Sequence, residues 1–315
     1  MTFRYPSLVE LHLHLEGTIY PKEALYLSQK NKIPFSENIF SHNSFEDFLR
    51  HFGKAVSLLK EKEDFALILN NHLKRLKKWG VIYAEIRISP SVWEYFGLNS
   101  EEIAKFIFSL NFDNCPKFNF IIESVRHWET KFLEKDFLMA VKNREKVKGF
   151  GLGGNEILAP IENFKFLFTE CKKNRIEFIP HCGEVTSADE VLKAVDFGAK
   201  RIGHGVKSVE SGSVIKRVRE ENVHLEICPT SNYALGVIKQ NSEHPLKEFY
   251  RRGIKFSIST DDPALFKTTL KKELFLTEKT LNFEKDCIFK IQKDAIHASL
   301  MNSSEKEKML RKHFL

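Results

Sequence analysis

Polar and apolar residues alternate without interruption along residues 9–16, VELHLHLE. This two-residue period is typical of a β-strand. One face of the strand would be aliphatic and the other polar, with Val9, Leu11, Leu13 and Leu15 opposite Glu10, His12, His14 and Glu16. A surface strand with its polar face in water would fit this pattern. So would a strand of an α/β barrel whose histidines point inward, and the rest of the chain has to distinguish the two.

Short β-branched or apolar runs alternate with longer helical patterns along the whole chain. Eight runs are predicted to be strands: 9–14, 81–88, 118–124, 147–152, 176–181, 200–204, 223–228 and 254–260. Most pairs are separated by a helix-length segment, such as 187–198, which opens with a serine cap and a Ser-x-x-Glu capping box. Eight strands that alternate with helices predict an α/β fold, a (β/α)8 TIM barrel.

The chain contains no Pro-, Gly- or Ser-rich linker, low-complexity tract or sequence repeat that would divide it, so a single domain over residues 1–315 is expected. Residues 21–79 are long for a βα connection and hold three helical patterns, which predicts a helical lid after the first strand. Residues 267–315 are expected to form extra C-terminal helices. Structural packing explains those helices without a function.

Composition excludes several classes of protein. Hydrophobic residues at 42% and charged residues at 29% are typical of a soluble globular protein. No secretory signal and no apolar run of the ~18–20 residues needed to span a bilayer is seen, so a cytoplasmic protein without a membrane partner is expected. The five cysteines form no CxxC pair. The net charge of +7 comes largely from lysines mixed with glutamates on helical stretches, so no nucleic-acid partner is expected. The oligomeric state is left open.

Chemically reactive side chains gather at the C-terminal ends of four predicted strands: His12 and His14, His181 and Glu184, His204, and Asp261 and Asp262. In a (β/α)8 barrel these ends meet at one face, where active sites lie. Each group alone is a weak signal, because a single histidine is commonly structural and Asp-Asp-Pro commonly forms a turn. Their joint placement at one rim predicts a functional site.

These residue types suit a metal-dependent hydrolase. Zinc binds imidazole nitrogen and carboxylate oxygen, and catalytic zinc sites keep one position for water. Four residues form such a donor set and are the predicted metal ligands: His12, His14, His181 and Asp261. Three more would supply the acid and base groups that hydrolysis needs beside the metal: Glu184, His204 and Asp262. No nucleophilic serine or cysteine is required. Arg87, at the end of the second strand, is expected either to meet a substrate or to form an ordinary ion pair.

The segments HxHLEGT, HCGE, RIGHGV, CPTSN and STDDPA, in this order and spacing, resemble the adenosine/adenine deaminase branch of the amidohydrolase superfamily. The resemblance extends from Val9 to about residue 300 and includes the barrel, the lid and the C-terminal helices. It implies a zinc-dependent hydrolase that replaces the C6 amino group of a 6-aminopurine by oxygen and releases ammonia.

The resemblance also implies roles by position. The zinc ligands would be His12, His14, His181 and Asp261. Glu184 matches the acid that protonates purine N1, while His204 and Asp262 match the groups that orient and deprotonate the attacking water. Gly154 matches a glycine whose backbone N–H contacts purine N3. The residues that match substrate-binding positions are His14, Glu16, Gly154 and Asp262. The segment GFGLGGNE lacks the metal-bridging lysine of binuclear relatives, which favours one zinc ion per chain.

Three positions of the sequence bear on the choice of substrate. In the resemblance, Glu16 takes the position of an aspartate in the HxHLDG segment of adenosine deaminases. That aspartate reaches the ribose 5′-hydroxyl of the substrate. Gly153-Gly154 replaces a serine pair common in adenine deaminases, and STDDPALF resembles 6-aminodeoxyfutalosine deaminases of the futalosine route to menaquinone. A 6-aminopurine nucleoside is therefore expected, 6-aminodeoxyfutalosine first and adenosine close behind, with free adenine as the alternative. A non-catalytic purine-binding protein and a metal-dependent phosphoesterase stay open as other classes.

Overall fold

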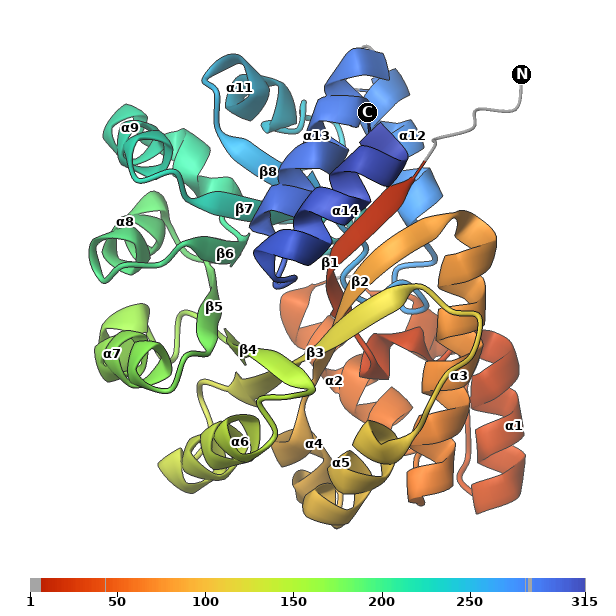
Figure 1. The fold of residues 1–315 in the computed structure, drawn as a ribbon. Helices are drawn as coiled ribbons and strands as arrows, with labels where there is room; N and C mark the ends of the chain where they lie inside the picture. The colour runs from red at the N-terminus through yellow and green to blue at the C-terminus, as the bar shows by residue number, and fades with distance from the viewer. Residues whose placement is uncertain (1–6, 43, 281, 283–284, 315) are drawn as a thin grey trace.

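The computed structural model describes residues 7–42, 44–280, 282 and 285–314. Its strands form one parallel sheet in chain order, and Figure 1 shows them in a ring with helices around the outside. The strands are β1 Leu8–His14, β2 Val81–Ile88, β3 Lys117–Val125, β4 Val147–Gly153, β5 Glu177–Cys182, β6 Arg201–His204, β7 His224–Ile227 and β8 Lys255–Ile258. Each predicted strand is present, with ends within two residues of those expected, and the predicted (β/α)8 barrel is confirmed.

The first and last strands meet at a short seam just beyond β8. Leu13 forms a parallel bridge with Asp261. The backbone N–H of His14 donates to the carbonyl of Asp261 and the N–H of Asp261 donates to the carbonyl of His12, both at 2.9 Å. The seam therefore places the two histidines of β1 beside the Asp-Asp pair, although some 250 residues separate them in the sequence.

The two faces of β1 have different surroundings, and both are buried. Val9 and Leu11 pack in an apolar cluster with residues of the C-terminal helices and of the connection between them, Ala295, Ile296, Met301 and Phe314. The histidines on the other face are also excluded from solvent, with His12 at 0% and His14 at 6% exposure. The surface-strand interpretation of VELHLHLE is therefore wrong, and its polar face points into the barrel.

Fourteen α-helices are found in the described part of the chain. They are α1 Pro21–Asn31, α2 Phe45–Val56, α3 Lys62–Trp79, α4 Pro90–Tyr95, α5 Ser100–Ser109, α6 Thr130–Lys142, α7 Lys165–Lys173, α8 Ala188–Asp196, α9 Gly212–Glu220, α10 Pro229–Ala234, α11 Leu246–Arg251, α12 Leu270–Thr280, α13 Lys285–Ala298 and α14 Ser303–Phe314. None of the helices that the structure describes combines the length and the apolar character needed to span a bilayer. Residues 1–6, 43, 281, 283–284 and 315, which the predicted single-domain range also includes, lie outside the described residues.

The expected capping box of α8 is wrong, although the helix itself starts where predicted. Ser187 occupies the N-cap position but its side chain makes no capping hydrogen bond. The carboxylate of Glu190 instead accepts a hydrogen bond from the backbone of Ile161 at 2.5 Å and pairs with Arg126 at 3.5 Å. Tertiary partners have therefore replaced the local cap, which sequence spacing alone could not indicate.

The long segment after β1 contributes α1, a short 3₁₀ turn Glu37–Phe40, α2 and α3. Helix α2 begins with a genuine cap, because Ser44 accepts a hydrogen bond from the backbone of Asp47. Its apolar side packs on the loop that follows β8, where the ring of Phe48 stacks on Phe266 with centroids 5.1 Å apart. This contact holds α2 beside the C-terminal ends of the strands.

Candidate active site

A cavity of about 580 Å³ opens at the C-terminal ends of the strands. Its floor contains six of the seven predicted polar residues, namely His14, His181, Glu184, His204, Asp261 and Asp262, and its lining also includes Gly153 and Gly154. Helix α2, helix α4 with the residue after it, and the segment after β3 add an aromatic wall, with Phe45, Phe48, Phe52, Tyr95, Phe96 and Trp128. His12, the seventh predicted residue, is fully buried.

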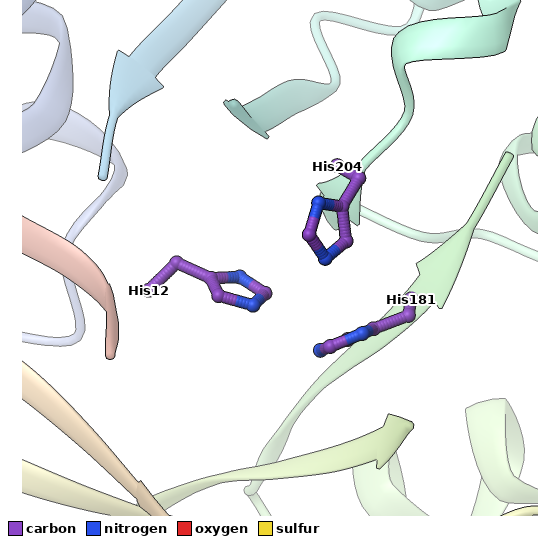
Figure 2. A group of neighbouring side chains, drawn as sticks. All are labelled: His12, His181 and His204. Atoms are coloured by element: carbon purple, nitrogen blue, oxygen red, sulfur yellow. The ribbon is translucent and has the colours of Figure 1, made fainter. Parts of the chain in front are cut away.

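The four predicted metal ligands lie together. The Nε2 atoms of His12 and His14 are 3.3 Å apart, and Asp261 Oδ1 lies 3.5 Å from the first and 3.3 Å from the second. The ring of His181 is 4.7 Å from that of His12, centroid to centroid. Figure 2 shows the rings of His12, His181 and His204 directed toward a common space from three different strands.

This donor set fits a divalent metal ion. Two triplets that share His12 have ligand atoms within 4.8 Å of one another: His12 with His14 and Asp261, and His12 with His181 and the neighbouring His204. Three imidazoles with one carboxylate is the kind of nitrogen and oxygen set that zinc takes in catalytic sites. All of these side chains are buried.

The backbone at two of these residues is unusual. His204 has φ of +59° and Asp261 has φ of +62°, in the left-handed region that non-glycine residues seldom adopt. Each such residue costs of order 1–3 kcal/mol and persists where the surrounding structure holds it, often at functional sites. Here the conformation turns each side chain out of its strand end and into the cavity.

Two hydrogen-bonded partners orient the predicted ligands, and sequence reasoning missed both. Glu226 Oε2 lies 2.7 Å from His12 Nδ1, and the hydroxyl of Ser231 donates to Asp261 Oδ2 at 2.8 Å. Hydrogen-bonded partners of this kind fix the tautomer and direction of a metal ligand. Ser231 belongs to the CPTSN segment, which could have identified it. Glu226 lies within β7 and belongs to none of the recognised segments.

Glu184 is held in place by a second glutamate. Glu156, of GLGGNE, accepts backbone hydrogen bonds from Gly183 at 3.1 Å and Glu184 at 3.2 Å, and a further one from the hydroxyl of Thr186. Burial, reinforced by the charges of Asp261 and Glu156, raises the pKa of Glu184 well above its usual range. This shift favours the protonated carboxyl group, which is the form able to donate a proton.

His204 and Asp262 complete the predicted catalytic group. His204 Nε2 lies 3.6 Å from Glu184 Oε2, and burial holds the pKa of His204 well below its usual value, so its ring is neutral. His204 Nδ1 and Asp262 Oδ1 are buried without a hydrogen-bond partner among the described residues. Gly17 packs so closely on Asp262 that a Cβ at this position would overlap the carboxylate, which explains the glycine of HLEGT.

Three other predicted residues take distinct positions. Gly154 has φ of +92° and lines the cavity beside His127. Glu16 is fully buried and outside the cavity lining, and its Oε1 accepts hydrogen bonds from Trp93 Nε1 at 2.7 Å and from the backbone of Ser89 at 2.9 Å. Arg87 is buried in ion pairs with two glutamates and does not line the cavity. Of the two alternatives for Arg87, the structure supports the ion pair.

An imidazole–carboxylate cluster at the C-terminal end of a (β/α)8 barrel, beside a glutamate with a raised pKa and a neutral histidine, is the arrangement of a metal-dependent hydrolase. The family model described as adenosine deaminase matches residues 7–313. The chain therefore belongs to the adenosine deaminase family, which makes it a purine deaminase, a hydrolase acting on the C6 amino group.

Individual relatives cover nearly the whole chain. It is 30% identical over 311 residues to an adenine deaminase of Rhizobium meliloti, an alignment that covers 96% of each protein. It is 28% identical over 317 residues to an aminodeoxyfutalosine deaminase of Streptomyces avermitilis, covering 95% of this chain and 88% of that one. The crystal structure of an adenine deaminase from Arthrobacter aurescens matches with a TM-score of 0.90 at 25% identity, over 98% of both chains.

Proposed function

We propose that this protein is a zinc-dependent deaminase of free adenine that produces hypoxanthine and ammonia. The observation that carries the proposal is the convergence of His12, His14, His181 and Asp261 beside Glu184, whose pKa is raised by burial. The adenine deaminases of Rhizobium meliloti and Arthrobacter aurescens support free adenine better than the nucleoside preference expected from the sequence. One zinc ion per chain and a cytoplasmic location remain predictions.

The side chains of the cavity account for the proton transfers. A divalent ion held by the four ligands would supply the Lewis acidity that activates water. Glu184 donates its proton to ring nitrogen N1, which makes C6 electrophilic. Neutral His204, with Asp262, accepts a proton from the water as the water oxygen bonds to C6, and passes that proton to the amino group. The C6–N bond then breaks, ammonia leaves, and the proton of the remaining C6 hydroxyl returns to Glu184 as the 6-oxo group forms. Gly154 offers its backbone N–H to purine N3.

A second candidate substrate is a purine with a substituent on N9. The cavity of about 580 Å³ lies in the range of roughly 300–1,000 Å³ typical of pockets for drug-sized ligands, so a purine ring alone leaves space. The remaining wall is aromatic and includes the cations Arg50 and Lys54. Such a wall suits an aromatic or anionic substituent, as in 6-aminodeoxyfutalosine, and the Streptomyces avermitilis relative bears that name.

The substrate is tested by measuring kcat/KM for adenine, adenosine and 6-aminodeoxyfutalosine with zinc-loaded protein, following the ultraviolet change on deamination. The highest value is expected for adenine. A highest value for 6-aminodeoxyfutalosine or adenosine would instead establish the N9-substituted class. No turnover of all three would contradict the deaminase proposal, and retained purine binding or phosphate-ester hydrolysis would then identify the alternative class.

A further inference from the structure

Glu123 is a buried carboxylate at the edge of the site that none of the roles above includes. It lies on β3, is 5% exposed and lines the cavity floor. Its Oε1 is 3.5 Å from His14 Nδ1, and its Oε2 is 3.1 Å from His181 Nε2. The neighbouring strand β4 leaves space for it, because a Cβ at Gly151 or Gly153 would overlap its carboxylate.

A single guanidinium connects Glu123 to Glu226. Arg87 Nη1 donates to Glu123 Oε2 at 2.6 Å, and Nη2 donates to Glu226 Oε2 at 2.7 Å. That same oxygen of Glu226 lies 2.7 Å from His12 Nδ1. Each histidine of the HxH pair therefore has a glutamate at its Nδ1 side, and Arg87 holds both glutamates.

We propose that Glu123 and Arg87 are positioning residues for the metal-binding histidines, with Glu123 acting on His14 as Glu226 acts on His12. The inference rests on the proposed metal site. The Nε2 atoms of both histidines face Asp261. An ion bound there would take Nε2 of each ring, and Nδ1 would then carry the proton and need an acceptor that fixes the ring. Two buried carboxylates need a paired cation, and the planar fork of arginine meets both at once.

The test measures zinc affinity by chelator competition and the visible spectrum of the cobalt-substituted protein, without substrate. Glu123→Ala is expected to weaken zinc binding about 10–100-fold, as loss of such an orienting partner typically does. Glu123→Gln keeps an acceptor oxygen and should recover most of that loss. The cobalt spectrum should keep its ligand-field bands in both, because the ligands themselves are unchanged.

Two further variants make the test decisive. Arg87→Lys should weaken zinc binding at least ~10-fold, because one ammonium does not hold two carboxylates in a fixed geometry. Glu23→Gln is the matched control, since Glu23 is a buried glutamate paired with Arg75 and lies outside the cavity lining, and the zinc affinity of this variant should stay at the wild-type value. Circular dichroism checks the fold of each variant. Should Glu123→Ala fail to fold, the zinc affinity of Arg87→Lys provides the test.

Three results would overturn the inference. Wild-type zinc affinity in Glu123→Ala, or in Arg87→Lys, would remove the positioning role. Altered cobalt bands in Glu123→Gln would make Glu123 a direct ligand instead. Absence of metal binding by the wild-type protein would contradict the proposed metal site itself, which separates that failure from a failure of the positioning role.

Discussion

At the scale of single residues, burial separates the protonation states of two adjacent groups. Glu184 and His204 lie 3.6 Å apart, and burial raises the pKa of the carboxyl group while it lowers that of the imidazole. Both shifts favour the neutral form, which makes the carboxyl group a proton donor and the imidazole an acceptor. Pairs of titratable groups whose pKa values are driven apart in this way identify the acid and the base of a site.

Glu184→Gln removes the proton donor and keeps the shape of the side chain. We expect kcat to fall about 10²–10⁴-fold, the usual contribution of general acid–base catalysis, with zinc content unchanged. Steady-state kinetics and metal analysis of the purified variant provide the measurement. A wild-type kcat would refute the acid role of Glu184.

Gly17→Ala tests the close packing on Asp262. The added methyl group has to displace the carboxylate, and a displacement of about 1 Å at a catalytic group can cost roughly 10²-fold in rate. We expect such a loss in kcat. The control is Gly212→Ala at the start of α9, where nothing lies near the added Cβ. Equal activity of the two variants would contradict the packing argument.

At the scale of elements, the sequence predicted the framework but not its cross-connections. Each strand has its own local pattern, so their positions followed from the residues within them. The expected ligands followed too, because strand ends of a barrel meet at one face. Glu226 could not be found in this way, since its contact with His12 joins residues 214 positions apart and depends on strand register. Glu190 is the opposite case: the local sequence predicted a helix cap, but the side chain binds the backbone of Ile161 instead.

Helix α3 contains a histidine whose burial should make stability depend on pH. His72 is 1% exposed, and neither ring nitrogen has a hydrogen-bond partner among the described residues. Burial, with the charge of Arg75, lowers its pKa to about 3, against 6.5 for an ordinary histidine. As pH falls, His72 is protonated in the unfolded chain before it is protonated in the folded one. The contribution of neutral His72 is therefore complete above pH 6.5 and is lost between pH 6.5 and about 3.

The variant His72→Phe lacks the titratable imidazole. Its free energy of unfolding should fall less steeply with decreasing pH than that of the wild type, by up to about 1.4 kcal/mol per pH unit. Urea unfolding at several pH values between 7.5 and 4 measures the difference. Parallel curves for the two proteins would show that His72 is not buried in its neutral form.

At the scale of the whole molecule, the predicted ligands come from the first, fifth and last strands of the chain and meet at one end of the barrel. His12 and His14 belong to β1, His181 to β5, and Asp261 follows β8. A bound ion would thus connect the seam between the first and last strands, and it would bind the folded chain in preference to the unfolded one. At a free zinc concentration 100 times the Kd this adds about 2.7 kcal/mol.

Removal of the metal should therefore lower Tm, and adding zinc back should restore it. Differential scanning calorimetry of chelator-treated and zinc-reconstituted protein measures the shift. His181→Ala, which removes one proposed ligand, is expected to reduce the difference between the two forms. An equal Tm with and without zinc would argue against an ion bridging these strands.

The central claim is that one metal ion, held at the end of the barrel, enables deamination of a 6-aminopurine. The most direct test titrates metal-free protein with zinc and measures ammonia release from adenine at each step. The account predicts no release without metal, a linear rise, and a plateau at one zinc ion per chain. Full activity in the metal-free protein, or a plateau only at two ions, would contradict it.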